Sequence, residues 1–208
     1  LDPNYALAYA GMADAYGLLG SATGGLPPKQ TYPKAKAAAL KALEIDDTLG
    51  EAHSALGFFR LLYDWDFAEA ERQFKRAVEL NPNYPSAHDG YGFVCKVMGR
   101  HAKAISACRH ALELDPLSLF ITMSVAWAYY FARDFDLAIE YGAKALEMDP
   151  GFGVAYWNTG LCYEQKGLYD KAVASFQQAV ALSGRVPNFV AHLGRAWALS
   201  GRTVEAQV

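Results

Sequence analysis

The sequence predicts an all-α fold in which antiparallel helical hairpins stack into a solenoid. Two observations lead to this fold class. Small residues recur in register along almost the whole chain, with a period of about 34 residues. A proline also closes several of the repeating blocks. A block of this length holds one helical hairpin, which cannot bury its apolar face alone and therefore needs neighbouring hairpins.

Three columns of small residues define the repeat. The first column comes early in each block, where two helices would approach closely: Ala13, Gly57, Gly92, Ala126, Gly160 and Gly194. The second column belongs to a second helix: Ala35, Ala70, Ala104, Ala138, Ala172 and Ala206. The third column follows two helical turns later on the same face: Ala42, Ala77, Ala111, Ala145 and Ala179. These columns predict close packing between helices throughout the chain.

Prolines mark the ends of blocks. The chain reads Leu-Asn-Pro at 80–82, Leu-Asp-Pro at 114–116 and Met-Asp-Pro at 148–150. Proline lacks the N–H that continuation of a helix needs, so each one ends a block. Two junctions, at Asp47 and Gly184, lack this proline and are expected to be looser. The predicted blocks are 6–49, 50–84, 85–118, 119–152 and 153–186, followed by a partial block, 187–208.

This combination of small columns and a terminal proline resembles the tetratricopeptide repeat. The resemblance covers nearly the whole chain, and it is specific because several spaced columns agree over successive blocks. It implies a right-handed solenoid whose first helices line the concave side. It also implies a non-catalytic role in protein–protein interaction. Residues 1–208 are expected to form a single solenoid domain that is part of a longer array.

The segment 21–33 is an insertion in the first block, because it is longer than the corresponding turns elsewhere. It contains Gly24-Gly25 and Pro27-Pro28. Either Pro28 or Pro33 could occupy the first turn of the next helix, where a missing N–H costs nothing. The segment is either a contact site or a tolerated insertion.

The turn at 63–67 is also unusual, because it is lengthened and strongly aromatic. Together with the run 69–82 it resembles repeats of large bacterial signalling proteins. In such proteins a repeat array often follows a DNA-binding, kinase or cyclase domain. By analogy, the chain is a structural, self-associating or regulatory segment of such a protein; this is the alternative to an independent binding role.

The sequence contains no pattern that predicts catalysis, a metal site or a cofactor. Residues 20–25 have the glycine spacing of a phosphate loop, but Leu26 stands where the lysine is needed and a helix precedes the segment. His53 and His88 share a packing column, and the other histidines lack partners at metal or triad spacing. We therefore expect a chain that is not an enzyme and needs no cofactor.

Charge and hydropathy argue against nucleic acid and membrane as partners. The chain has 19 Lys and Arg against 22 Asp and Glu, without a basic run that could follow a phosphate backbone. The uncharged segment 117–132 is shorter than the roughly 20 residues that a bilayer span needs. Cys95, Cys108 and Cys162 lack paired spacing, which favours a reducing compartment and hence a cytoplasmic location.

The predicted binding surface is the concave face, where the resemblance places particular columns of the first helices. The expected partner-binding residues are Phe58, Leu62, Phe93, Lys96, Phe120, Met123, Trp127, Tyr130, Phe131, Trp157, Asn158 and Leu161. The early columns also hold Asp14, Glu51 and Asp89. The clamp for acidic peptides that chaperone-binding members use is not expected, because Ala10, Asp14, Ala55, Ser86 and Gly90 occupy its positions.

The main functional clue is the segment 119–132, which is apolar nearly all round. A helix needs only one apolar stripe to pack against its neighbours. The surplus aromatic residues either bind an apolar helix or an extended peptide of a partner protein, or they pack against adjacent repeats or a capping segment of the array. The identity of the partner is not predicted, and self-association is an open alternative.

Overall fold

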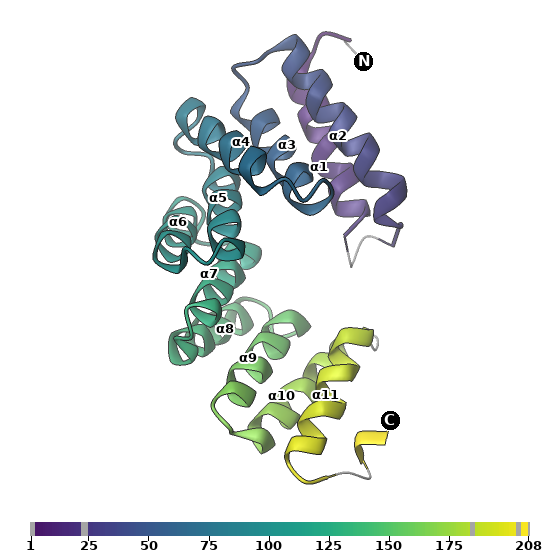
Figure 1. Cartoon of the computed structure of the whole chain (residues 1–208), viewed down its shortest axis with the longest axis vertical. Coiled ribbons are helices and arrows are strands. Elements are labelled where there is room, and N and C mark those ends of the chain that lie inside the picture. Colours follow the sequence, from purple (N-terminus) through teal and green to yellow (C-terminus); the bar gives the residue numbers. More distant parts are fainter. Residues whose placement is uncertain (1–2, 22–24, 184–185, 203–204, 208) are drawn as a thin grey trace. The chain divides into compact units, whose positions relative to one another are not determined.

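The structure is a computed structural model that describes residues 3–21, 25–183, 186–202 and 205–207 (Figure 1). The described residues form helices and no strands, which confirms the predicted all-α class. The elements are α1 (Ala6–Leu19), α2 (Pro28–Ile45), α3 (Gly50–Leu62), α4 (Phe67–Leu80), α5 (Pro85–Val97), α6 (His101–Leu114), α7 (Leu119–Phe131), α8 (Phe135–Met148), α9 (Gly153–Gln165), α10 (Tyr169–Leu182), α11 (Pro187–Leu199) and the short 3₁₀ helix η1 (Glu205–Gln207).

The chain divides into two compact units, Leu1–Leu114 and Asp115–Val208, which we call unit 1 and unit 2. In unit 1, α1 pairs with α2, α3 with α4 and α5 with α6. In unit 2, α7 pairs with α8 and α9 with α10, and α11 packs on α10. First helices of neighbouring hairpins also touch, α1 with α3, α3 with α5 and α7 with α9. Each hairpin falls within one of the blocks predicted from the sequence.

Local sequence signals explain where several helices begin. Asp66, Ser118 and Asp134 cap α4, α7 and α8, because each side chain accepts a hydrogen bond from a backbone N–H in the first turn. Pro28 and Pro85 occupy the first positions of α2 and α5, where the missing N–H would have had no helical partner.

Glycines of the first column allow a phenylalanine of the second helix to approach closely. A Cβ added to Gly57 would lie 3.0 Å from Cε1 of Phe74, and one added to Gly160 would lie 2.7 Å from Cε1 of Phe176. Both phenylalanines are fully buried. The close helix approach that the small columns predict is therefore present in both units.

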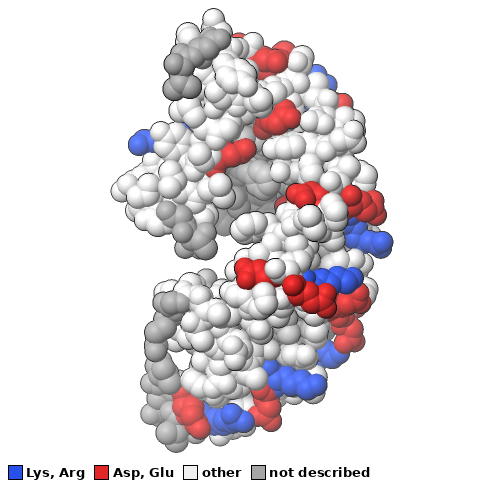
Figure 2. All heavy atoms as spheres, turned by 180° about the vertical axis from the view of Figure 1, so that it is seen from behind, with Lys and Arg blue, Asp and Glu red and all other residues white. Residues whose placement is uncertain are grey.

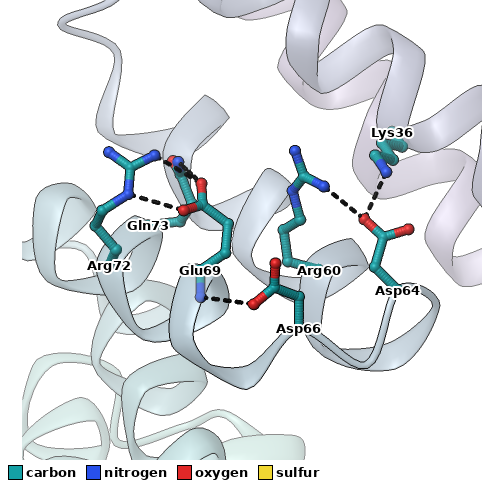
Figure 3. A network of polar contacts seen from close by, with 7 residues as sticks. All are labelled: Lys36, Arg60, Asp64, Asp66, Glu69, Arg72 and Gln73. Carbon is teal, nitrogen blue, oxygen red and sulfur yellow. Dashed lines mark hydrogen bonds and ion pairs between the residues drawn. The ribbon is translucent and has the colours of Figure 1, made fainter.

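An ion-pair network joins α2 and α3 at the aromatic turn (Figure 3). Asp64 accepts hydrogen bonds from Lys36 of α2 and, at 2.9 Å, from Arg60 of α3. The side chains of Lys36, Arg60 and Asp64 are each less than a third exposed, so solvent screens the attraction between their charges less than at the open surface. The network fixes the end of α3 against α2.

The insertion in the first block is shorter than the predicted segment 21–33, because α2 already begins at Pro28. Pro28, and not Pro33, is therefore the proline in the first turn of the helix. Pro33 lies inside α2, where its missing N–H leaves one helical hydrogen bond unmade. Residues 22–24 of the insertion, and Gly184 of the last junction, lie outside the described residues.

Candidate binding surfaces

In unit 1, the first helices form an open pocket of about 320 Å³. Helices α1, α3 and the start of α5 supply most of its wall, and α2 and the turn after α1 complete it. Phe58 and Leu62, two of the predicted binding residues, line it, as does the groove residue Asp14. The full lining is Asp14, Gly17, Leu18, Ser21, Tyr32, Ser54, Phe58, Phe59, Leu62, Tyr84 and Ser86.

The charged group that lines this pocket is the carboxylate of Asp14. Asp14 is exposed at the rim, yet the apolar groups around it raise the pKa of its carboxyl by desolvation. Burial raises the pKa of the Tyr84 phenol, and the negative charges of Asp14 and Glu51 raise it further, against a hydrogen bond with Ser86. Red carboxylate side chains border the hollow of unit 1 in Figure 2.

The other predicted residues of unit 1 are less accessible. Phe93 is half-buried, and Lys96 is buried with its ammonium nitrogen 4.8 Å from the centre of the Phe93 ring. Lys96 therefore packs against its own helix and offers little surface to a partner. Within the pocket, Phe58 is itself half-buried and packs edge-on against Phe74, with ring centres 4.9 Å apart.

In unit 2, aromatic rings from the first helices of three successive blocks form a row. The ring centres of Trp127 on α7 and Trp157 on α9 lie 5.2 Å apart, and Trp157 stacks on Phe189 of α11 at 5.0 Å. Both tryptophans are half-buried, whereas Phe189 is buried. We call Trp127, Trp157 and Phe189 the aromatic row.

Further aromatic side chains of α7 adjoin this row. Tyr130 lies 5.6 Å from Trp127, and the exposed ring of Phe131 lies 5.5 Å from Tyr130 and 6.2 Å from Trp127. Phe120 is exposed and touches Phe152 edge-on at 5.9 Å. Part of the aromatic surplus of α7 is thus used in contacts within unit 2, and part remains open to solvent.

Three predicted binding residues of unit 2 lie beneath the surface. Met123, Asn158 and Leu161 are only 3%, 0% and 7% exposed. The family resemblance assigns them to groove columns of their helices but gives no information about depth, and in the structure neighbouring side chains cover them. They support the surface from below and do not form it.

His53 and His88 form local hydrogen bonds, and the three cysteines are buried. His53 and His88 each bond a carbonyl of the preceding loop, of Asp47 at 3.0 Å and of Pro82 at 2.8 Å. All three cysteines are buried and free, and burial raises the thiol pKa of Cys108 to about 12, which keeps it protonated and unreactive. The same holds for Cys162, whose pKa burial also raises to about 12.

Among the described residues, no three histidine, cysteine, aspartate or glutamate side chains are placed to hold a metal ion. Within the same part of the chain, no helix is long and apolar enough to cross a bilayer.

A family profile described as tetratricopeptide repeat matches residues 60–118 and 126–188. The chain belongs to the tetratricopeptide repeat family. Solenoids of stacked repeats present extended concave surfaces, which serve to bind other proteins.

Similar proteins agree with this membership. Human tetratricopeptide repeat protein 6 is 23% identical over 180 residues, which cover 86% of this chain and 33% of that protein. The chain thus spans about a third of this curated relative.

Two solved structures share the fold. The structure of PilW, a type IV pilus biogenesis factor, matches with a TM-score of 0.81 at 18% identity, over 97% of this chain and 89% of that one. The structure of YrrB, described as a tetratricopeptide protein with an unusual peptide-binding site, matches with a TM-score of 0.61 at 20% identity, over 91% and 92%.

Proposed function

We propose that this chain is a non-catalytic interaction scaffold that binds a peptide or helix of a partner protein on the face made by its first helices. The observation that carries the proposal is the aromatic row of unit 2. Its two tryptophans come from consecutive first helices and remain partly open to solvent. Phe131, exposed beside Trp127, extends this surface along α7.

Tryptophan and tyrosine are enriched among the residues that contribute most to binding at protein interfaces. A ring held between neighbouring rings loses little conformational freedom when a partner covers it, so little of the binding energy is spent on ordering. Trp127 is held in this way, since Trp157 and Tyr130 both lie within 6 Å of it. Peptide binding by a structural neighbour, as the description of YrrB states, supports the same role here.

The alternative, self-association or regulation of an attached domain, makes a different prediction. If the terminal repeat joins copies of the chain, purified protein should form dimers or larger species whose mass falls with Leu193→Glu and not with Trp127→Glu. Light scattering coupled to gel filtration measures this mass directly.

A cytoplasmic location stays a prediction.

Selection from a random peptide display library tests peptide binding. The bait is the full chain, and selected peptides are then synthesised and titrated by fluorescence anisotropy. We expect Trp127→Ala to weaken their binding about tenfold or more, as loss of a central aromatic contact does at other interfaces.

The matched control is Trp65→Ala, because Trp65 is 73% exposed at the turn before α4 and lies outside the first helices. It should leave peptide affinity unchanged. Circular dichroism verifies that both variants stay folded. The proposal fails if the library yields no binding peptide, or if folded Trp127→Ala binds every selected peptide as tightly as the parent chain does.

A further inference from the structure

We propose that the pocket of unit 1 receives a lysine or arginine side chain of a bound peptide. This inference rests on the proposed function and adds the chemistry of the partner. It concerns unit 1 alone.

The shape of the pocket suits a long side chain with an apolar stem. Leu18, Phe58 and Leu62 supply apolar and aromatic wall, and the cavity of about 320 Å³ is open to solvent. Lysine and arginine bury their methylene stems along such surfaces while the charged head reaches a polar group. An aromatic ring in the wall also favours a cation over a neutral group of similar size.

The polar end of the pocket favours a positive charge. Asp14 stands at its rim, and no lysine, arginine or histidine is among the described residues that line it. Glu51 adds negative potential, because its charge raises the pKa of Tyr84, which lines the same wall. Glu51 itself accepts a hydrogen bond from the Asn81 side-chain amide at 3.0 Å, which leaves its negative charge uncancelled.

A cation beside Asp14 would stabilise the ionised form of its carboxylate. Desolvation raises the pKa of this group, which means that the charged form is less stable here than in water. An ammonium or guanidinium at the rim would offset that cost through a charge-assisted hydrogen bond. A carboxylate of a partner would instead be repelled by both Asp14 and Glu51.

The pocket wall is held in place before any partner arrives. Asp64, two residues after Leu62, binds Lys36 and Arg60 and so fixes the end of α3 against α2 (Figure 3). Those two cations are engaged by Asp64 and are not lining residues of the pocket. Preorganisation of this kind lowers the cost of binding.

The test uses peptides selected on the full chain from a random display library. We expect lysine or arginine to be enriched at one position among the peptides. For one such peptide, replacing that residue by glutamine should weaken binding to the parent chain about tenfold, a loss typical for one charge-assisted contact. On Asp14→Asn the lysine and glutamine peptides should bind within about twofold of each other, because the charge partner is gone.

Asp14→Asn should fold normally, because it removes a charge that the folded state disfavours. The matched control is Asp47→Asn, an exposed carboxylate of unit 1 outside the pocket, which should discriminate between the two peptides as the parent does. Peptides that bind without any enriched basic residue, or with an acidic one, would overturn the inference but leave the proposed function standing. A lysine preference that Asp14→Asn retains in full would also overturn the inference and leave the proposed function standing. If no peptide binds, both proposals fall.

Discussion

Phe74 of α4 lies directly against the backbone of Gly90 on α5: a Cβ on Gly90 would be 2.0 Å from Cε1 of the ring. Gly57 of α3 faces the same ring, at 3.0 Å from such a Cβ. Phe74 is fully buried, so its ring has no open space into which it could withdraw. One side chain therefore joins the second and third hairpins, and two glycines make room for it.

We expect Gly90→Ala to destabilise the fold, because the new methyl group cannot be accommodated without displacing Phe74 or separating α4 from α5. Overpacking of a buried site typically lowers the free energy of unfolding by about 1–3 kcal/mol. Urea denaturation followed by circular dichroism measures this change. An unchanged midpoint would mean that Phe74 does not pack against Gly90 as described.

Gly11→Ala is the matched control, since Gly11 is exposed within α1 and an added Cβ would meet no atom within 4 Å. There the same substitution should raise the free energy of unfolding by about 0.5–1 kcal/mol, because alanine is the better helix former. Opposite signs for the two variants would separate steric crowding from helix propensity.

Glu71 links α4 to the start of α6 and should make the stability of unit 1 depend on pH. Arg100 donates two hydrogen bonds to its carboxylate, at 3.0 and 2.7 Å, and Lys75 forms an ion pair with it at 2.8 Å. The hydrogen bonds from Arg100 and then from Lys75 lower the pKa of Glu71 to about 2. We expect Glu71→Gln to lower the free energy of unfolding by about 2 kcal/mol at neutral pH.

This difference should shrink in acid. The folded-state pKa of Glu71 lies below its ordinary value of 4.5, so the unfolded chain binds more protons between these two values. The stabilisation is complete above the ordinary value and is lost as pH falls toward about 2. Thermal unfolding of both proteins over this range measures the difference; a gap that stays constant with pH would contradict a role for the ionised carboxylate.

The hairpins could be predicted from sequence because their determinants are local and repeat. A small residue such as Gly57 or Gly160 marks a close approach wherever it recurs in register, and the structure places Phe74 and Phe176 there. The pairing of Glu71 with Arg100 was not predictable in the same way. Charged residues are common on these helices, and the repeat period does not specify which pair will meet across a hairpin junction.

The candidate surfaces were only partly predictable. The repeat columns carried over from the family resemblance identify a face of a helix but not the depth of a side chain, so they group the half-buried Trp127 with Asn158, which is fully buried. The pocket of unit 1 depends on Tyr84, a residue just before α5. No column of the repeat marks Tyr84, and only the packing of α1, α3 and α5 brings it near Asp14.

Arg133 adopts a left-handed backbone conformation at the turn between α7 and α8, with a φ of +65°. Glycines occupy the equivalent positions of three other turns: Gly99, Gly167 and Gly201 have φ values of +70°, +72° and +83°. Residues with a Cβ pay about 1–2 kcal/mol for this conformation, whereas glycine adopts it freely.

We therefore expect Arg133→Gly to raise the free energy of unfolding by about 1 kcal/mol, somewhat less than the full strain because glycine also gains freedom in the unfolded chain. Ala132→Gly tests whether backbone strain is the cause. Ala132 has a φ of −74°, which imposes no strain on alanine. Glycine at this position should therefore lower the free energy of unfolding by about 0.5–1 kcal/mol. Chemical denaturation of the two neighbouring variants compares them directly. If both lose stability, the turn does not depend on a positive φ at residue 133; if only Ala132→Gly loses stability, strain at Arg133 accounts for the difference.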